Sequence, residues 1–562
     1  MLKKKLAQIK KAITREKVFD AIFLSLLCIV YSIVAFTNLG DDTAPQTFFR
    51  LQSEEKLAIV LDEPVASPNL MFYVGISRND FDISFARVDN YDPTKNQGLI
   101  SEEEISSYWI KNIDGPFRWK LNKLPGKQNV IIINNNASGR FIDFGEIAVF
   151  SDDTRVGAKF YRFDSGILDN SDETLSNLDD ERDIVPKEQT FMNSSYFDEL
   201  YFAQTAYQYS TEQLGYETVH PPLGKLLQSI PITITGRMTP FTWRFMGTFV
   251  GVLIIIATYF LALEIFKKPS FARVAAILVS LSGLHFVQTR VGTVDSHLCL
   301  FTILAFLSMM KFLNSDGKFR YFILSGVFYG CAFTVKWSGA FCGVGLALML
   351  FSYLAKTKQW DFKNTIFKNL ISKDIRKWIR RGSLCFILIP GIIYCSCYLL
   401  FPKTTDAHSM NDVSIQSMHL FRYHKGELTP HPYSSKWYTW PIALKPMLYA
   451  YDNTNNKSIY LTGNYAIAYV SIIGLLITLY MAYKKRDIVN SVIIGAWLGL
   501  WLPYALIERT MFLYHYLPAS IFAILALVNI FYQVPKIRSI LPYYLVAALI
   551  SFIIIYPNMV GL

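Results

Sequence analysis

Long apolar runs separated by short polar joints make up most of the chain after residue 240, and one further run, Val18–Thr37, lies near its start. Val18–Thr37 is about as long as one bilayer crossing, and the later runs repeat this apolar character. The pattern predicts a mainly α-helical, polytopic membrane protein with about eleven transmembrane helices. The predicted spans are Val18–Thr37, Thr242–Phe266, Val274–Val287, Val294–Leu313, Tyr321–Val335, Gly339–Leu354, Ser383–Phe401, Tyr465–Tyr483, Ile488–Leu506, Leu513–Tyr532 and Ile540–Tyr556.

Basic residues mark one side of these predicted spans. They crowd in the arm Lys3–Lys17 and in the loop Lys356–Arg381, both beside apolar runs. Because cytoplasmic loops carry the excess of Lys and Arg, we predict a cytoplasmic N-terminus and an uncleaved first span. An odd number of spans then places the C-terminus outside. The chain is expected to be a multi-pass protein of the cell membrane, divided into a basic arm (1–17), a first span (18–37), an exterior domain (38–164), a linker (165–192), a catalytic exterior loop (193–239) and a multi-span domain (240–562).

The polar region after the first span has a different pattern. Short runs that alternate apolar and polar residues, such as Asp82–Val88 and Asn129–Ile133, are separated by turn residues. This period of two predicts an antiparallel β-sandwich over residues 38–164. Its last part, Gly139–Phe150, resembles the final strands of galactose-binding-like jelly rolls, and a sugar-binding or a purely structural exterior domain both stay open. Residues 165–192 are acidic and poor in apolar residues, which predicts a linker or an extended strap.

Composition excludes two classes of protein. With 52% hydrophobic residues, 18% charged residues and a positive mean hydropathy, the 562-residue chain is too apolar for an ordinary soluble enzyme. The net charge of +11 does not indicate nucleic acid, because the basic residues follow the positive-inside pattern. None of the seven cysteines falls between residues 38 and 239, so disulfides do not hold the exterior domain.

Two adjacent carboxylates, Asp198 and Glu199, stand among aromatic residues just before the chain enters the membrane. Charge is costly in such surroundings, so the pair suggests acid–base or metal chemistry. The alternative is a short serine-capped helix in which the two acids complement the N-terminal dipole. His220 begins a His-Pro-Pro turn and adds an imidazole at the mouth of the next helix.

Several basic side chains emerge on the predicted exterior face. Arg290 lies near the hydrocarbon boundary, where a lipid phosphate would fit its bidentate guanidinium; the alternative is an interfacial anchor. Lys336 ends a span beside a tryptophan and has the same two interpretations, phosphate binding or snorkelling. Arg509 and His515 supply further donors in the joint before the tenth span. For Asp295 we prefer a helix N-cap.

The predicted exterior loop 402–464 is rich in histidine and aromatic side chains. Such groups hydrogen-bond sugar hydroxyls and pack against the C–H face of a sugar ring. An aromatic belt at the level of the lipid headgroups explains the tryptophans equally well. No zinc spacing, P-loop or dinucleotide fingerprint occurs. The candidate sugar- or acceptor-binding residues are His220, His431, Tyr433, Trp437 and Trp440.

Five motifs in chain order resemble those of the bacterial-type protein O-mannosyltransferases, glycosyltransferase family 39, and the match covers roughly 70% of the chain. No segment resembles the MIR repeats of the eukaryotic members. The resemblance implies the GT-C membrane fold, a polyprenyl-phosphate sugar donor and a catalytic aspartate at Asp198. The motifs are Phe197-Asp-Glu199, His220-Pro-Pro-Leu-Gly-Lys225, Thr289–Ser296, Val335-Lys-Trp337 and Arg509–Pro518.

The function implied by this resemblance is transfer of a mannosyl or other hexosyl group to Ser or Thr hydroxyls of exported proteins, with inversion at the anomeric carbon. Asp198 would take the acceptor proton, while Glu199 and His220 would orient the loop or the acceptor. Cations suffice for a phosphate leaving group, so no cofactor is expected, although a divalent cation on these three residues is conceivable. The residues expected at the donor phosphate are Arg290, Lys336, Arg509 and His515.

Two alternatives remain at this point. The first keeps the fold and the donor but sends the sugar to a lipid or a cell-wall polymer. The second is a transporter or receptor with an exterior binding domain. A transporter places charges or broken helices near mid-bilayer, whereas the charges here lie at span ends on one face. The enzyme is therefore the preferred hypothesis, with membrane lipids, the donor lipid and exported proteins as its partners.

Overall fold

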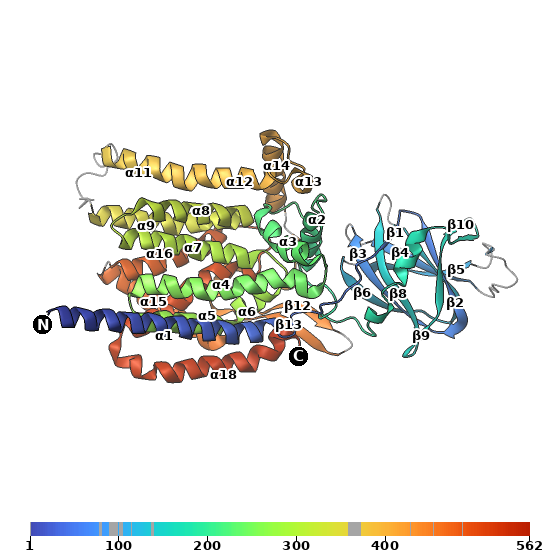
Figure 1. The fold of residues 1–562 in the computed structure, drawn as a ribbon, viewed down its shortest axis with the longest axis horizontal. Helices are drawn as coiled ribbons and strands as arrows, with labels where there is room; N and C mark the ends of the chain where they lie inside the picture. Colours follow the sequence, from blue (N-terminus) through green and yellow to red (C-terminus); the bar gives the residue numbers. More distant parts are fainter. Residues whose placement is uncertain are drawn as a thin grey trace. The chain divides into compact units, whose positions relative to one another are not determined.

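The computed structural model describes residues 2–77, 81–88, 99–100, 105–113, 115–136, 140–357, 373–426, 429–452, 455–485 and 487–562. The chain divides into two compact units (Figure 1). The helical unit comprises residues 1–39, 208–230 and 244–562, and the sheet unit comprises residues 40–207 and 231–243.

Membrane-spanning helices dominate the helical unit. Within the described residues, nine helices are long and apolar enough to cross a membrane, and α5 (Pro269–Ser280) with α6 (Gly283–Arg290), bent by 57°, makes ten if the pair is one span. α8 (Phe319–Val335), also predicted as a span, is apolar but has 17 residues. The multi-pass prediction is confirmed, whereas the count of about eleven is not. The nine are α1 (Leu2–Phe36), α4 (Pro240–Phe266), α7 (Asp295–Asn314), η4 (Trp337–Phe341) with α9 (Cys342–Thr357), α11 (Lys373–Ser383) through η5 (Leu384–Leu388) to α12 (Ile389–Leu399), α15 (Tyr465–Lys485), α16 (Ile488–Trp501) with η7 (Leu502–Leu506), η8 (Leu513–Tyr516) with α17 (Leu517–Gln533), and η9 (Pro535–Ile540) with α18 (Leu541–Val560).

Helix α17 forms the centre of this unit. Its apolar window is 94% buried, against 17% for the peripheral α1 and α18. Small residues allow close helix packing: a Cβ on Gly474 of α15 would lie 2.7 Å from the backbone of Ala526 in α17, and one on Gly499 of α16 would lie 2.8 Å from the backbone of Gly345 in α9. Lipid tails are as apolar as these helices, so van der Waals packing of this kind holds the bundle together.

The segments between the spans carry short elements of their own. α2 (Glu199–Ser210) and α3 (Leu223–Thr235) flank the His-Pro-Pro turn, whose prolines favour the start of a helix. The predicted loop 402–464 contains α13 (Pro402–Thr405), α14 (Met410–Gly426), η6 (Trp437–Ile442) and the hairpin β12 (Met447–Asp452) and β13 (Lys457–Leu461). Residues 358–372 of the predicted cytoplasmic loop lie outside the described residues.

The sheet unit contains two antiparallel sheets that share an apolar core. One has the order β1-β8-β3-β6, with β9 beside β8, and the other has the order β11-β10-β2-β7-β4-β5. Ile59 of the second sheet and Phe72 and Phe144 of the first belong to one buried cluster, as period-two patterning requires. The strands are β1 (Phe49–Leu51), β2 (Lys56–Ala66), β3 (Asn69–Ser77), β4 (Phe81–Val88), β5 (Ile105–Ile113), β6 (Arg118–Lys123), β7 (Lys127–Asn135), β8 (Ile142–Ser151), β9 (Thr154–Val156), β10 (Ala158–Asp164) and β11 (Ile167–Asp169).

The acidic segment after these strands is a strap fixed to the sheets. It contains the short helices η2 (Glu173–Leu178) and η3 (Arg182–Ile184). Arg155 of β9 pairs with Asp179 at 2.5 Å, and the backbone N–H of Glu181 donates to the buried Glu146 of β8 at 2.6 Å. The acidic composition therefore serves ion pairs and hydrogen bonds to the sheet unit.

Candidate active site

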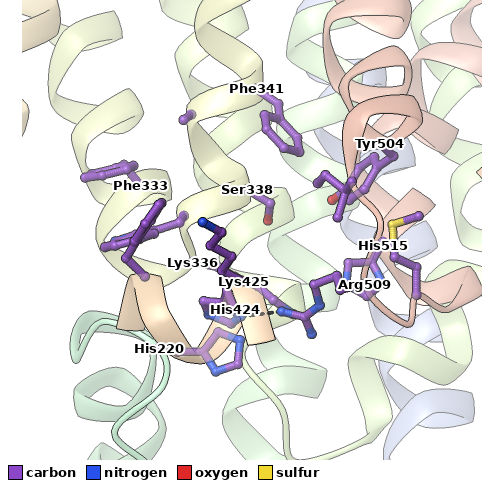
Figure 2. Close-up of a pocket in the computed structure, with 15 residues that line it drawn as sticks. His220, Phe333, Lys336, Ser338, Phe341, His424, Lys425, Tyr504, Arg509 and His515 are labelled. Carbon is purple, nitrogen blue, oxygen red and sulfur yellow. Dashed lines mark hydrogen bonds between the residues drawn. The ribbon is translucent and has the colours of Figure 1, made fainter. Parts of the chain in front are cut away.

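A pocket of ≈ 500 Å³ lies among four segments of the helical unit (Figure 2). The His-Pro-Pro turn, the junction of α8 and η4, helix α14, and the segment from η7 to η8 each contribute side chains. Figure 2 shows His220, His424 and Arg509 gathered on one side, with Phe341 and Tyr504 on another. The lining residues are His220, Phe333, Lys336, Trp337, Ser338, Ala340, Phe341, Phe421, His424, Lys425, Tyr504, Ile507, Arg509, Met511 and His515.

The charge of this lining is entirely positive. Lys336, Lys425 and Arg509 line the pocket, and no carboxylate appears among the described lining residues. Lys336 is 9% exposed and donates to Asp295 of α7 at 3.0 Å, so its ammonium is held in place. Arg509 donates to Nδ1 of His424 and, in the described part of the chain, forms no ion pair. The pocket therefore favours an anion, and its aromatic walls favour an apolar group attached to that anion.

Two histidines on the polar side are held in their neutral form. His424 accepts from Arg509 at Nδ1, so its Nε2 carries the hydrogen and donates to the carbonyl of Val219 at 2.8 Å. Burial, with the neighbouring His220 and Arg509, lowers the pKa of His424 to about 4. His220 bonds through Nδ1 to the carboxylate of Glu217 at 2.7 Å, and burial lowers the pKa of His220. Neutral imidazoles keep the cations from facing further positive charge.

A stacked aromatic wall supports His515. Nδ1 of His515 donates to the carbonyl of Phe512 at 3.0 Å, and its ring stacks on Trp440 with centroids 5.9 Å apart. Trp440 is 1% exposed and donates from Nε1 to Ser435. Trp437 packs its ring edge against Trp501 and accepts from the Nε1 of that residue. These tryptophans do not line the pocket; they fix the segments that do.

The other two predicted sugar contacts also lie off the pocket lining. His431 accepts from the backbone N–H of Tyr433 at 3.2 Å, and its ring meets Phe512 edge-on at 5.1 Å. Of the predicted site residues, the structure brings His220, Lys336, Arg509 and His515 together in the pocket. It does not bring His431, Tyr433, Trp437 or Trp440 there, and their sugar-binding role stays a prediction.

Arg290 has a different set of partners from the predicted phosphate. It is 5% exposed and donates to the carbonyls of Ala35 at 2.6 Å, Thr37 at 3.0 Å and Asn38 at 2.7 Å. Helix α1 ends at Phe36, so the carbonyl of Ala35 is one that a helix C-terminus leaves unsatisfied, and those of Thr37 and Asn38 follow directly after the helix. The guanidinium caps α1 and complements the negative end of its dipole. Arg290 does not line the pocket.

The Asp198–Glu199 pair belongs to the sheet unit, and its two members differ. Asp198 is partly exposed, and its carbonyl accepts from the backbone N–H groups of Tyr201 and Phe202 in the first turn of α2. Glu199 is fully buried and accepts from the backbone of Tyr196 at 3.2 Å and from Nε1 of Trp243 at 3.1 Å. Glu199 thus fixes the loop, and Asp198 has the more accessible carboxylate.

Sequence reasoning missed some residues that build the site. Glu217 and Lys225 support the pocket from behind, and Phe421 forms part of its wall. Lys225 stands within the His-Pro-Pro-Leu-Gly-Lys motif and could have been singled out there. Glu217 carries no signal, since a lone acid three residues before a histidine is common in loops.

Fold and pocket together define a multi-pass membrane protein with a pocket lined by cations and aromatic side chains. Residues 188–403 match the family model described as dolichyl-phosphate-mannose-protein mannosyltransferase. Residues 410–561 match the C-terminal four TMM region of protein-O-mannosyltransferase. The chain belongs to the protein O-mannosyltransferase family, of bacterial type.

Individual relatives agree with this assignment. The chain is 25% identical over 440 residues to the polyprenol-phosphate-mannose–protein mannosyltransferase of Mycolicibacterium smegmatis, covering 65% of this chain and 84% of that protein. It is 26% identical over 354 residues to the protein of the same name from Corynebacterium glutamicum, covering 53% and 67%. The S. cerevisiae protein O-mannosyltransferase Pmt1–Pmt2 complex bound to the sugar donor matches with a TM-score of 0.56 at 15% identity, over 65% of this chain and 87% of that one. This last similarity shows a shared fold.

Proposed function

We propose that this protein transfers a mannosyl group from a polyprenyl-phosphate donor to Ser or Thr hydroxyls of exported proteins, inverting the anomeric carbon. The observation that carries the proposal is the pocket of the helical unit, where Lys336 and Arg509 stand beside aromatic walls and no carboxylate is among the described lining residues. A phosphate diester of a sugar and a long isoprenoid has the matching chemistry: one negative charge between a polar head and an apolar tail.

The two cations act on the leaving group. As the bond from the anomeric carbon to the phosphate oxygen breaks, the phosphate gains negative charge. Preorganised donors therefore stabilise the transition state more than the ground state. Lys336 is fixed by Asp295, and Arg509 is oriented by His424. Phosphate is already a good leaving group, so the reaction needs no general acid. We therefore assign the donor phosphate to Lys336 and Arg509 and not to Arg290.

A second cavity adds room for the lipid. It has ≈ 530 Å³, and Trp337 and Phe421 line both it and the cationic pocket. Its other walls come from α12 and α14 and are mostly apolar, including Tyr394, Met410 and Met418. We assign the first isoprene units of the donor to this cavity, because hydrocarbon next to a phosphate needs an apolar surface close at hand.

Asp198 is proposed as the base that takes the acceptor proton. Asp198 is partly exposed at the start of α2, which supports this assignment, and the resemblance of the Phe197-Asp-Glu199 motif to that of the family implies the same role. Glu199 is proposed to position that loop through Trp243. The reaction as proposed requires no metal, and transfer that continues in a strong chelator is the expected result.

The orientation in the membrane belongs to this proposal. A cytoplasmic N-terminus, eleven spans including α8 and the bent α5–α6 pair, and an exterior C-terminus form one consistent scheme. The basic residues Lys484 and Lys485 at the end of α15 and Arg538 in η9 support it, because they stand at predicted cytoplasmic joints. A cysteine introduced at Leu562 should react with an impermeant reagent from outside, and one at Lys485 should not.

The sheet unit bears on the choice of acceptor. The family matches begin at residue 188, so the two sheets before it stand apart from the matched region and suit an acceptor-guiding or galactose-binding-like role. A lipid or a cell-wall polymer is the second candidate acceptor, because the two sheets lie outside the region that the family models match. Mass spectrometry of exported proteins with and without this gene tests the choice. Loss of hexose from Ser or Thr supports the proposal, and unchanged protein glycosylation with altered envelope lipids or polymers overturns it.

A further inference from the structure

A buried ion pair stands directly behind the His-Pro-Pro turn. The ammonium of Lys225 donates to Oε2 of Glu217 at 2.6 Å, to the carbonyl of Glu217 at 2.6 Å and to the carbonyl of His220 at 2.8 Å. Lys225 is 1% exposed and Glu217 is 7% exposed. All three N–H donors of Lys225 are therefore used within the protein, and none is available to a donor phosphate.

The second oxygen of Glu217 sets the state of the neighbouring imidazole. Oε1 of Glu217 lies 2.7 Å from Nδ1 of His220, and a carboxylate can only accept, so Nδ1 carries the hydrogen. Although burial alone raises it, Lys225 and His220 lower the pKa of Glu217 to about 2, which keeps the carboxylate ionised. In neutral His220 the other ring nitrogen is then a hydrogen-bond acceptor.

We propose that Glu217 and Lys225 are positioning residues that hold His220 as a neutral hydrogen-bond acceptor for a substrate hydroxyl in the cationic pocket. The inference rests on the proposed function and names a part of its specificity. The pocket offers three cations and, among its described lining residues, no carboxylate, so acceptors for sugar or Ser/Thr hydroxyls are few. His424 spends both ring nitrogens on Val219 and Arg509, so of the two histidines on the polar side His220 is the one suited to this task.

The pair also suits the charge of its surroundings. His220 faces Lys225 from α3, Lys336 from the α8–η4 junction, and His424 of α14, whose ring centroid is 5.4 Å away; Arg509 lies beyond His424. An isolated carboxylate here would attract Lys336 or Arg509 away from the phosphate. Because Lys225 neutralises Glu217, the imidazole is oriented without adding net charge to the pocket.

A thermodynamic cycle of substitutions separates positioning from mere support. The combined variant Glu217→Gln/Lys225→Met removes both charges, which is less disruptive than leaving one buried charge unpaired. We expect it to lower kcat/KM about 10- to 100-fold. In a His220→Ala background, the same two substitutions should cause no further loss. A matched control is Glu264→Gln/Lys267→Met, which removes a Lys–Glu pair of equal length, 2.6 Å, at the end of α4 and should leave kcat/KM unchanged.

The pH profile gives a second readout. Glu217 raises the pKa of His220, and Lys225 lowers that pKa more weakly. Removing both residues should therefore lower the pKa of His220 and move the acid limb of the kcat/KM profile to lower pH. A purely structural role would scale the whole profile without moving the limb. If the wild type transfers the sugar but the losses in the cycle are additive, or the acid limb does not move, the inference about Glu217 and Lys225 is wrong while the proposed function stands. Absence of transfer by the wild type overturns the proposed function first.

Nitrogen-15 NMR of histidine-labelled wild-type protein tests the tautomer even if the variants fold poorly. The chain has eight histidines, and the signal lost in His220→Gln identifies the one in question. Hydrogen on Nδ1 is the expected result. Hydrogen on Nε2 alone, or on both nitrogens at neutral pH, would rule the proposal out.

Discussion

Lys336 and Asp295 form a buried ion pair at 3.0 Å between the end of α8 and the start of α7. The other oxygen of Asp295 accepts from Gln288 at 3.3 Å, and Gln288 in turn accepts from the hydroxyl of Tyr449 in the β12–β13 hairpin. The pocket cation is thus the inner end of a hydrogen-bonded chain that begins in an interhelical hairpin. Such a chain restricts Lys336 to one position before any ligand arrives.

The first prediction concerns this pair. Asp295→Asn leaves the buried ammonium with a weaker partner, so kcat/KM for the donor should fall about tenfold. Lys336→Met should cause a larger loss because it removes the cation itself. Donor titration and initial rates would measure both effects. Asp143→Asn, which breaks the pair with Arg50 in the sheet unit, is the control. Equal rates in Asp295→Asn and wild type would show that Lys336 needs no fixed partner.

The second prediction separates the two adjacent acids. Asp198→Asn keeps the shape of the side chain but removes the base, so turnover should fall by about two to four orders of magnitude with little change in donor binding. Glu199→Gln keeps an acceptor for Trp243 and should cost less turnover, while lowering thermal stability. Single-turnover rates and thermal unfolding would be compared. Near-normal turnover of Asp198→Asn would move the active site elsewhere.

Two arginines give the third prediction. Arg509→Ala should weaken donor binding and slow transfer together, because its charge acts on the phosphate. Arg290→Ala should instead lower the stability of the protein by about 2–3 kcal/mol, because it leaves the end of α1 without its cap. Donor affinity and thermal unfolding in detergent distinguish the two. If Arg290→Ala weakens donor binding as strongly as Arg509→Ala does, the phosphate-binding role that the sequence predicts for Arg290 is right.

The fourth prediction uses the length of the donor lipid. Met418→Ser makes the shared apolar cavity more polar, so KM should rise about fivefold for a long polyprenyl donor. It should not change for a short-chain isoprenoid donor that does not reach Met418. Ile554→Ser on α18, a residue 70% exposed and far from this cavity in sequence, is the matched control. The same KM increase for both donors would place the lipid elsewhere.

The fifth prediction concerns pH. The pKa of His424 is lowered to about 4 in the folded protein, whereas an unfolded histidine titrates near 6.5. The unfolded state therefore binds more protons between these values, and stability should be complete above about pH 6.5 and decline as pH falls toward 4. Protonation also breaks the bond from Arg509. Thermal unfolding across this range should show a flatter dependence for His424→Gln; an unchanged slope would contradict the prediction.

Part of the site could be predicted because motifs at the ends of apolar runs share one face of a bundle. His220, Lys336, Arg509 and His515 are far apart in sequence, yet the alternation of spans places them together. Arg290 shows the limit of that reasoning. Its partners are backbone carbonyls about 250 residues earlier, and backbone groups leave no trace in residue type. Phosphate binding and helix capping require the same guanidinium at the same depth.

The count of about eleven spans stays a prediction for a physical reason of the same kind. Hydropathy registers an apolar run but not its path, so it does not reveal the bend of 57° between α5 and α6. The acidic segment 165–192 likewise has a composition that fits a linker and an extended strap equally well. Its partners, such as Arg155 for Asp179, lie on strands that precede it. Composition describes the segment alone, whereas its order comes from the surface that it contacts.

The cap of α1 bears on how this protein is assembled during synthesis. The carbonyls at the end of α1 are held by Arg290, and that of Leu39 by Arg244 at 3.0 Å, so both clamps are translated some two hundred residues after the helix that they secure. α1 is also among the least buried spans. We therefore expect α1 to stay loosely placed until α4 and α6, which follow it in the chain, have been inserted. Insertion defects in those later helices should appear as mobility or degradation of α1.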